Sequence, residues 1–232
     1  MTSASSLPEV APGTIAVWSD LLCPFSYVAL RRLTAARTRL GVNVPLDHHV
    51  FPLELFNGPH PRRGTDTEAV GLGHIEPGAH FRVWTASDDL YPHTVLLAAE
   101  AVLAAKAQSL AAGEALDLAL RRAFWTDSLS ISHRQVILAV ATEVAEADGI
   151  LDVDDLTARI DHGAHRAELM ADYAIAQTEE VGGSPTFVLP GGTSVTNPGI
   201  TVHWEGPWAA GFPVVDSADP DVYDNLLLRA TA

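Results

Sequence analysis

The residue with the clearest chemical potential is Cys23, the only cysteine among 232 residues, which is followed directly by Pro24. Proline is favoured at the first position of a helix, so this pair predicts that Cys23 is a helix N-cap residue. A thiolate there would accept hydrogen bonds from the free N–H groups of the first turn and would be stabilised by the helix dipole. Ser26, three residues later, could donate a hydroxyl hydrogen bond. We therefore expect Cys23 to be ionised at neutral pH and nucleophilic, rather than a small buried hydrophobic residue.

A second candidate segment is Ser184-Pro185, which follows two glycines and precedes a short apolar run. We expect the Ser184–Pro185 peptide bond to be cis and to expose the backbone N–H and C=O of Ser184. These groups could pair with an extended peptide or disulfide substrate as a short added strand. The alternative is that Pro185 only begins a strand. Asp20, three residues before the cysteine, is either a proton relay to the thiol or an ordinary loop residue.

The elements that must position these residues follow from the apolar pattern. Strands are expected at residues 14–19, 42–51, 186–189 and 201–204, with the last strand pairing with the one before it. Helices are expected at residues 25–40, 90–110, 114–125, 132–147, 154–161, 165–180 and 219–229. Residues 62–87 show no clear period and are assigned no structure. This order predicts an α/β core that is interrupted by an all-helical insertion.

Two segments carry a resemblance to a known family. Residues 18–33, WSDLLCPFSYVALRRL, resemble the active-site segment of the DsbA-like thioredoxin-fold family. Residues 183–188, GSPTFV, resemble the second signature of that family, a loop whose proline is cis and faces the nucleophile. The family includes cytosolic DsbA-like oxidoreductases, 2-hydroxychromene-2-carboxylate isomerases and kappa-class glutathione transferases. The resemblance implies a thioredoxin-like fold, with residues 13–57 and 166–232 as a discontinuous thioredoxin-like domain and residues 58–165 as a helical insertion domain.

The residue at position 26 decides which chemistry the resemblance implies. Members that oxidise or isomerise disulfides carry a second cysteine there, whereas the isomerase and transferase branch has serine at both positions. The motif Cys23-Pro24-Phe25-Ser26 matches the first branch at Cys23 and the second at Phe25 and Ser26. Without a second cysteine, a mixed disulfide on Cys23 needs an external thiol to resolve it. The resemblance therefore implies a monothiol (CPFS) DsbA-family thiol-disulfide oxidoreductase, with Cys23, Pro24 and Ser26 as catalytic residues.

The same resemblance implies how a substrate is bound. The resemblance implies substrate-binding roles for Phe25, Ser184, Pro185 and His93. For His93 the reason is that similar members place a histidine near its position, over the active-site cleft. We expect no tightly bound cofactor, and small thiols such as glutathione, or disulfide substrates, as partners. The glutathione-using members carry an Asp-Arg pair after the strand that follows the cis-proline. Residues 204–208, WEGPW, lack this pair, which argues against glutathione binding of the transferase kind.

Two other functions stay open. A thiol-cofactor-dependent isomerase or transferase, related to 2-hydroxychromene-2-carboxylate isomerase, would keep its activity in Cys23→Ser, because a hydroxyl can serve the thiolate of the cofactor. A non-enzymatic, peptide-binding thioredoxin-fold module would have a thiol of ordinary reactivity.

Composition excludes several further classes. The 14 basic and 29 acidic residues give a net charge of −15, which repels phosphate backbones and anionic lipids, so we expect neither a nucleic-acid nor a membrane partner. A single cysteine rules out an internal disulfide and a cysteine-based zinc site, and no metal site is expected. The N-terminal MTSASSLPEVAPG lacks the pattern of a secretory signal, and no long apolar run follows it. We therefore expect a cytoplasmic protein with a reduced thiol, for which a homodimer stays open.

Overall fold

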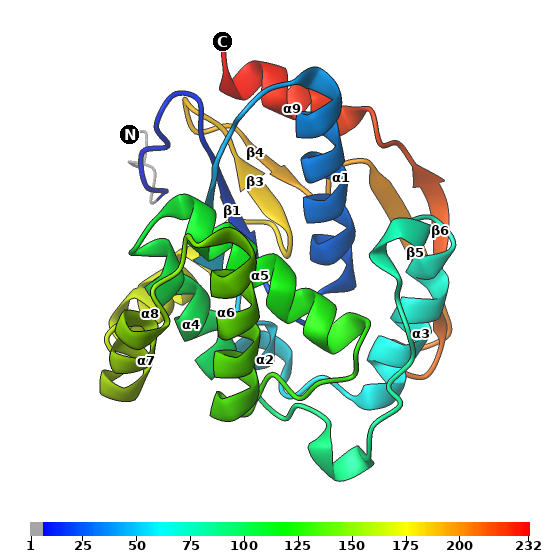
Figure 1. Cartoon of the computed structure of the whole chain (residues 1–232). Coiled ribbons are helices and arrows are strands. Elements are labelled where there is room, and N and C mark those ends of the chain that lie inside the picture. The colour runs from blue at the N-terminus through cyan, green and yellow to red at the C-terminus, as the bar shows by residue number, and fades with distance from the viewer. Residues whose placement is uncertain (1–6) are drawn as a thin grey trace.

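The computed structural model describes residues 7–232, and its centre is a four-stranded sheet (Figure 1). The first six residues of the N-terminal segment, in which we recognise no secretory signal, lie outside this description. The strands are β1 (Ile15–Ser19), β2 (Leu46–Val50), β3 (Thr186–Val188) and β4 (Ser194–Thr196), in the spatial order β2-β1-β3-β4. β1 runs parallel to β2 and antiparallel to β3. All five residues of β1 are buried, and the strand leads directly toward Cys23.

Two helices pack on one side of this sheet, α1 (Pro24–Leu40) and α9 (Val222–Ala230). With β1 and β3 they form a core cluster that includes Ile15, Val17, Leu30, Leu33, Phe187, Tyr223, Leu226 and Leu227. The helical spacing of the apolar residues in α1 turns one face of this helix toward the sheet. α1 ends at Gly41, whose φ of 66° lies in the left-handed region that favours glycine. The opposite end of α1 carries the cysteine.

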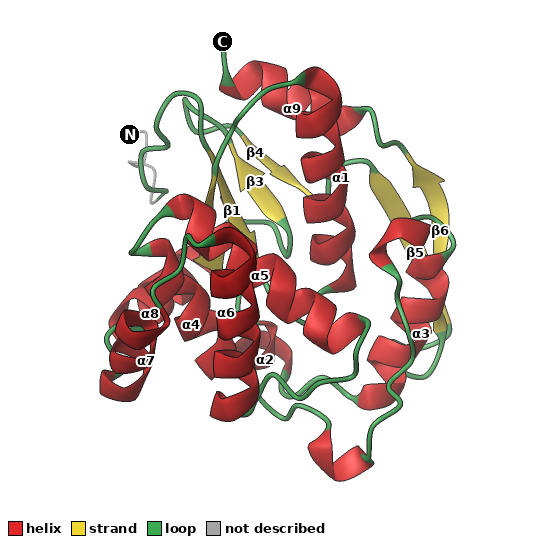
Figure 2. Cartoon of the chain, viewed as in Figure 1, coloured by secondary structure: helices red, strands yellow, loops and turns green. Residues whose placement is uncertain are grey.

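The remaining helices lie between β2 and β3 in the sequence (Figure 2). They are α2 (Leu53–Asn57), α3 (Arg62–Gly73), α4 (Leu96–Lys106), α5 (Leu110–Trp125), α6 (Arg134–Asp148), α7 (Val153–His162) and α8 (Arg166–Ala176), with short 3-10 helices at Pro77–Ala79 and Asp88–Leu90. Their apolar faces form a second core cluster, which includes Leu116, Leu120, Phe124, Trp125, Ile137 and Leu156. The predicted strand-helix core with helices inserted in its middle is confirmed. The domain boundaries at residues 57/58 and 165/166 stay a prediction.

The helix expected at residues 90–110 is shorter than predicted. α4 begins only at Leu96, because Glu54 of α2 holds the preceding residues: its carboxylate accepts the Val95 N–H at 2.7 Å and the Thr94 hydroxyl at 2.6 Å. At the other end, the Ser109 side chain accepts the Ala112 N–H at 3.0 Å and caps a new helix. α5 therefore starts four residues earlier than the expected residue 114.

The strand pairing near the C-terminus also differs from the prediction. Residues 201–204 do not pair with β3, because the Leu189 N–H donates to the Thr193 carbonyl and closes a tight turn, so β4 takes that edge. Instead, β5 (Ile200–Glu205) pairs antiparallel with β6 (Phe212–Ala218) in a separate two-stranded sheet. No strand was predicted for the residues of β6. The C-terminal part of the chain therefore holds two hairpins rather than one.

The segment 62–87, for which the sequence predicts no structure, contains the α3 helix. α3 packs against β6 and against α1, as Figure 1 also shows at the edge of the molecule. The approach is close at Gly71, where an added Cβ atom would lie 3.0 Å from Pro213. α3 and the β5–β6 hairpin therefore form one layer beside the end of α1 that carries Cys23. Within residues 7–232, no helix has the length and apolar character needed to cross a membrane.

Candidate functional site

Cys23 occupies the N-cap position of α1 with Pro24 in the first helical turn, as the sequence predicts. Its backbone is extended, with φ −85° and ψ 111°, which is the usual conformation of an N-cap residue. The side chain makes no capping hydrogen bond to the first turn. Instead, the Sγ atom donates a hydrogen bond of 3.1 Å to the carbonyl oxygen of Ser184. The thiol therefore faces the Ser184–Pro185 loop.

Two serine hydroxyls complete the surroundings of the thiol. The Oγ atoms of Ser26 and Ser184 lie 2.8 Å apart, and the Asp20 N–H donates to the Ser184 Oγ at 2.9 Å. The peptide bond between Ser184 and Pro185 is cis. Residues that are more than 150 positions apart in the sequence thus meet at one end of the sheet. The structure brings Cys23, Ser26, Ser184, Pro185 and Asp20 into one cluster.

Burial controls the protonation of the thiol. Cys23 is only 4% exposed, and the removal of a thiolate from water raises the pKa of Cys23. Hydrogen bonds from Ser184 and Ser26 lower this pKa, and the charge of Glu68 raises it, but burial is the largest influence. The prediction of a thiol that is ionised at neutral pH is therefore wrong for this structure. The helix N-terminus does not offset desolvation when the sulfur atom is covered.

Asp20 is buried, and both of its carboxylate oxygens accept backbone hydrogen bonds. Oδ1 accepts the Leu22 N–H at 2.6 Å, and Oδ2 accepts the Leu53 N–H at 2.9 Å. Burial raises the pKa of Asp20, while the charge of His60 and the two backbone hydrogen bonds lower it. The carboxylate thereby joins the turn before Cys23 to the start of α2. This geometry favours the structural interpretation of Asp20, and its role as a proton relay stays a prediction.

The other predicted residues lie in different surroundings. Pro24 is buried at the start of α1. Phe25 is partly buried and packs against the cluster of Leu72 and Ile200, which belong to α3 and β5. His93 is exposed in the loop before α4 and does not begin a helix, because α4 starts only at Leu96. The substrate-binding roles of Phe25 and His93 stay predictions.

A buried arginine that the sequence analysis missed holds the end of β1. Arg121 of α5 is fully buried and makes a two-point ion pair with Asp117, at 2.7 and 3.0 Å. The same guanidinium group donates to the Ser19 hydroxyl at 2.8 Å and to the Asp20 carbonyl at 2.6 Å. One side chain of the helical block therefore fixes the strand end that leads to Cys23. The i, i+4 spacing of Asp117 and Arg121 is the sequence signal that could have found the ion pair.

Three further residues near the thiol were also missed, Glu68, Trp208 and His60. Glu68 of α3 is 5% exposed, and its carboxyl group has the Trp208 side chain as a hydrogen-bonding neighbour. The rings of Trp208 and His60 meet edge to face, with their centres 5.9 Å apart. His60 in turn lies close enough to Asp20 for its charge to lower the pKa of that carboxyl group. No local sequence pattern marks these residues, because only the docking of the β5–β6 hairpin on α3 brings them together.

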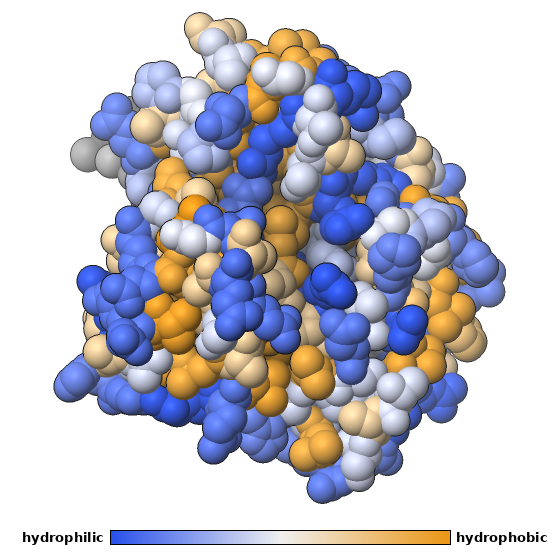
Figure 3. All heavy atoms as spheres, in the orientation of Figure 1, coloured by the Kyte–Doolittle hydropathy of each residue, from blue (hydrophilic) through white to orange (hydrophobic). Residues whose placement is uncertain are grey.

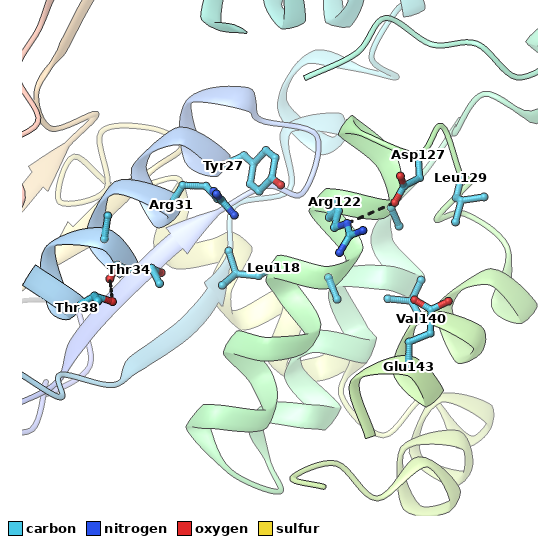
Figure 4. Close-up of a pocket in the computed structure, with 13 residues that line it drawn as sticks. Tyr27, Arg31, Thr34, Thr38, Leu118, Arg122, Asp127, Leu129, Val140 and Glu143 are labelled. Atoms are coloured by element: carbon cyan, nitrogen blue, oxygen red, sulfur yellow. Dashed lines mark hydrogen bonds and ion pairs between the residues drawn. The ribbon is translucent and has the colours of Figure 1, made fainter. Parts of the chain in front are cut away.

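One cavity of the structure does not include Cys23 in its lining. It has a volume of about 510 Å³ and lies between α1 and the helices α5 and α6 (Figure 4). Its lining includes Tyr27, Arg31, Leu118, Arg122, Val140 and Glu143. The space-filling view shows apolar side chains in the depression at this place (Figure 3). On α1 the lining runs from Tyr27, one helical turn beyond Cys23, to Thr38 near the other end of the helix.

Comparisons with known proteins bear on this arrangement. The family model of the DSBA-like thioredoxin domain matches residues 14–202. Among solved structures, the chain resembles a probable DsbA oxidoreductase from Streptomyces coelicolor, with 20% identity, a TM-score of 0.66, and coverage of 94% of this chain and 89% of that one. It also resembles the cytosolic disulfide reductase DsbM from Pseudomonas aeruginosa, with 20% identity, a TM-score of 0.53, and coverage of 78% and 87%.

A third similar structure is that of 2-hydroxychromene-2-carboxylate isomerase, with 16% identity, a TM-score of 0.59, and coverage of 78% of this chain and 87% of that one. No curated protein matches the chain. At these identities the solved structures support the fold, which is the thioredoxin-like α/β fold with inserted helices. The family model covers both the Cys23-Pro24 and the Ser184-Pro185 segments. The chain therefore belongs to the DSBA-like thioredoxin domain family, a family of DsbA-like thiol oxidoreductases.

Proposed function

We propose that the chain is a thiol-disulfide oxidoreductase of monothiol type, in which Cys23 attacks a disulfide. The observation that supports this proposal most strongly is the 3.1 Å hydrogen bond from the Cys23 Sγ to the Ser184 carbonyl oxygen, next to the cis peptide bond. A disulfide substrate bound at the sulfur atom would lie beside this carbonyl group. The backbone at Ser184 can then hold the substrate as a short added strand.

The proposed reaction starts from the neutral thiol. Cys23 loses its proton, and the thiolate attacks one sulfur atom of the substrate to form a mixed disulfide. The other sulfur atom leaves as a thiolate and takes up a proton. The hydroxyl groups of Ser26 and Ser184 lie beside the reacting sulfur atom and lower the pKa of Cys23, so they stabilise the attacking thiolate.

The mixed disulfide needs a partner outside the chain, because Cys23 is the only cysteine. Ser26 stands where a resolving cysteine would be, and its hydroxyl group is bound to Ser184. A small thiol of the glutathione type would attack the mixed disulfide and release the reduced product. We place this cycle in the cytoplasm, where reduced small thiols are kept abundant.

The test is the reduction of bis(2-hydroxyethyl) disulfide with reduced glutathione as the resolving thiol. Cys23→Ala should abolish the activity above the background. Ser26→Ala should slow it about tenfold, the value of one lost hydrogen bond to the thiolate. Ser217→Ala, an exposed serine in β6, serves as the matched control and should be unchanged. Equal activity of Cys23→Ala and the wild type would contradict the proposal.

A second function is favoured by one specific observation, namely the donor role of the Cys23 thiol. A neutral thiol that donates a hydrogen bond can stabilise the thiolate of a bound small-thiol cofactor, as a hydroxyl group can. The chain would then be a thiol-cofactor-dependent isomerase or transferase. Cys23→Ser separates the two functions, because it abolishes the reduction of disulfides but keeps an isomerase or transferase active.

A further inference from the structure

Glu68 is a buried carboxyl group without a complete set of partners. It lies in the middle of α3, is 5% exposed, and its Oε2 atom has no hydrogen-bond partner among the described residues. An ionised carboxylate in such a place would lose its hydration without compensation. Burial accordingly raises the pKa of Glu68 to about 8, although the Trp208 side chain lowers it by hydrogen bonding. The group is therefore mostly protonated at neutral pH and can donate a proton.

The groups that face Glu68 come from several elements. α3 lies against the start of α1, since Phe25 of that helix packs on the cluster that contains Leu72, one helical turn after Glu68. Burial raises the pKa of the Cys23 thiol most, and the charge of Glu68 raises it further. Burial is the main cause that raises the pKa of Tyr91, in the segment before α4, and the charges of Asp66 and Glu68 raise it further. Its hydroxyl group is paired with Thr65 at 2.9 Å. On the hairpin side lies Trp208, whose ring contacts His60. The Glu68 Oε2 atom has no hydrogen-bond partner among the described residues, so a proton on this atom has no competing acceptor there.

We propose that Glu68 is the general acid that protonates the departing sulfur atom when Cys23 attacks a disulfide. This inference rests on the proposed function and adds a catalytic residue to it. In a disulfide exchange the three sulfur atoms lie nearly in line, so the leaving sulfur atom is about 4 Å beyond the attacking one, the sum of two S–S lengths. In a covered site a free thiolate would be poorly solvated there, and a nearby acid that is already protonated removes this difficulty.

The atoms and charges of the step balance. The Cys23 thiolate forms a bond to the nearer sulfur atom of the substrate, and the S–S bond of the substrate breaks with its electron pair on the farther sulfur atom. The Glu68 carboxyl group transfers its proton to that atom, which leaves as a neutral thiol, and Glu68 becomes a carboxylate. Cys23 gives its proton to solvent water before the attack, and Glu68 takes up a proton from solvent afterwards, so the step consumes no net proton. The oxidant is the substrate disulfide itself.

The test compares two disulfides whose leaving groups differ in how much they need to be protonated on sulfur. The alkyl thiolate from bis(2-hydroxyethyl) disulfide is a strong base, whereas 2,2′-dithiodipyridine releases a thione that needs no proton on sulfur. At pH 7, Glu68→Gln should slow formation of the mixed disulfide from the alkyl disulfide about 100-fold, within the usual contribution of a general acid. The rate with dithiodipyridine should stay unchanged. The wild-type advantage should disappear as the pH rises past about 8, where Glu68 ionises.

Each other outcome has a definite meaning. If Glu68→Gln slows the reaction equally with both disulfides, Glu68 has only a structural role. If the rate of the variant with the alkyl disulfide is unchanged or faster, Glu68 only repels the thiolate. Either result overturns the inference. If the wild type reacts with dithiodipyridine but never with the alkyl disulfide, the proposed function itself fails. Glu146→Gln, the same change at an exposed position of α6, is the matched control. Should Glu68→Gln fold poorly, Glu68→Asp must restore part of the alkyl rate, and its failure to do so in a folded variant also overturns the inference.

Discussion

The Sγ atom of Cys23 lies 3.1 Å from the carbonyl oxygen of Ser184, a residue 161 positions later in the chain. A neutral thiol can donate to this carbonyl oxygen, whereas a thiolate cannot. The burial of the sulfur atom and its hydrogen bonds act on its pKa in opposite directions, and burial has the larger effect. The reactivity of Cys23 therefore depends on which of the groups around its sulfur atom a substrate displaces, as much as on the thiol itself.

The reactivity of free Cys23 should be that of a weakly acidic thiol. Because burial raises the pKa of Cys23 above its ordinary value of 9.0, the rate of alkylation by iodoacetamide should still be rising at pH 9. A pH series of alkylation rates, followed by intact mass, measures this directly. A plateau reached below pH 8 would show that the helix N-terminus dominates after all.

Glu68 should make the stability of the fold depend on pH. Its pKa is raised from 4.5 to about 8 in the folded state, so the folded state holds its proton more tightly than the unfolded state does. The contribution of Glu68 is therefore fully present below pH 4.5 and is lost as the pH rises to about 8, at about 1.4 kcal/mol per pH unit in that window. Glu68→Gln removes this dependence.

The measurement is the difference in the free energy of unfolding between wild type and Glu68→Gln at several pH values. In urea titrations, the free energy of unfolding of Glu68→Gln should rise relative to that of the wild type between pH 5 and pH 8. A difference that stays constant over this range would mean that the Glu68 pKa is not raised. Glu146→Gln, which changes an exposed carboxylate, should show no such trend.

Arg121 should be essential for stability. Its replacement by leucine leaves the buried carboxylate of Asp117 without its arginine partner and removes the hydrogen bonds to Ser19 and Asp20, at a cost of about 3–5 kcal/mol. The neighbouring Arg122→Leu is the matched control. The Arg122 side chain is 73% exposed, and its pairing with Asp127 should be worth about 0.5 kcal/mol or less.

Chemical denaturation of the two leucine variants checks this prediction. Removing Asp117 as well, in Arg121→Leu with Asp117→Leu, should recover part of the loss, because no buried charge then remains unpaired. Similar stabilities of Arg121→Leu and Arg122→Leu would contradict the role assigned to the buried ion pair.

Ser26→Cys should change a monothiol site into a dithiol site. Residue 26 lies in the first turn of α1, fully buried and next to the Ser184 side chain that also faces the thiol. A second thiol at this position should attack the mixed disulfide on Cys23, so the adduct becomes transient and a second equivalent of small thiol is released. Thiol release and intact mass report both effects.

In Ser26→Ala, by comparison, the mixed disulfide should persist as in the wild type. An equally persistent adduct in Ser26→Cys would show that the geometry of the first turn does not support an internal disulfide.

The parts of the site that were predictable from the sequence are those set by local chemistry. The Cys23-Pro24 pair marks a helix start whatever surrounds it, and the glycines before Ser184-Pro185 mark a turn into a strand. The burial of the Cys23 sulfur atom was not predictable, because its surroundings include Ser184 and Glu68, which are distant in the sequence. The sequence of α3 has no apolar period that would mark it as a helix. Its position depends on contacts with Pro213 and other residues that are distant in the sequence.

The same limit explains the error in strand pairing. Residues 201–204 alternate as an edge strand should, but alternation does not identify the partner strand. The short turn after Leu189 gives the edge of β3 to Ser194–Thr196, and residues 200–205 pair with a strand whose sequence contains a proline, Pro213. Glu68 and Trp208 meet only as a result of that pairing. No local sequence pattern could therefore predict Glu68 as the candidate acid of the site.

The most direct test of the central claim is the intact mass of the protein after incubation with bis(2-hydroxyethyl) disulfide under native conditions. The account predicts that the wild type gains one hydroxyethyl-thiol group, that peptide mapping places it on Cys23, and that reduced glutathione removes it. Cys23→Ala should gain nothing. A wild-type protein that keeps its unmodified mass, while it remains folded and its thiol can be alkylated at high pH, would contradict the account.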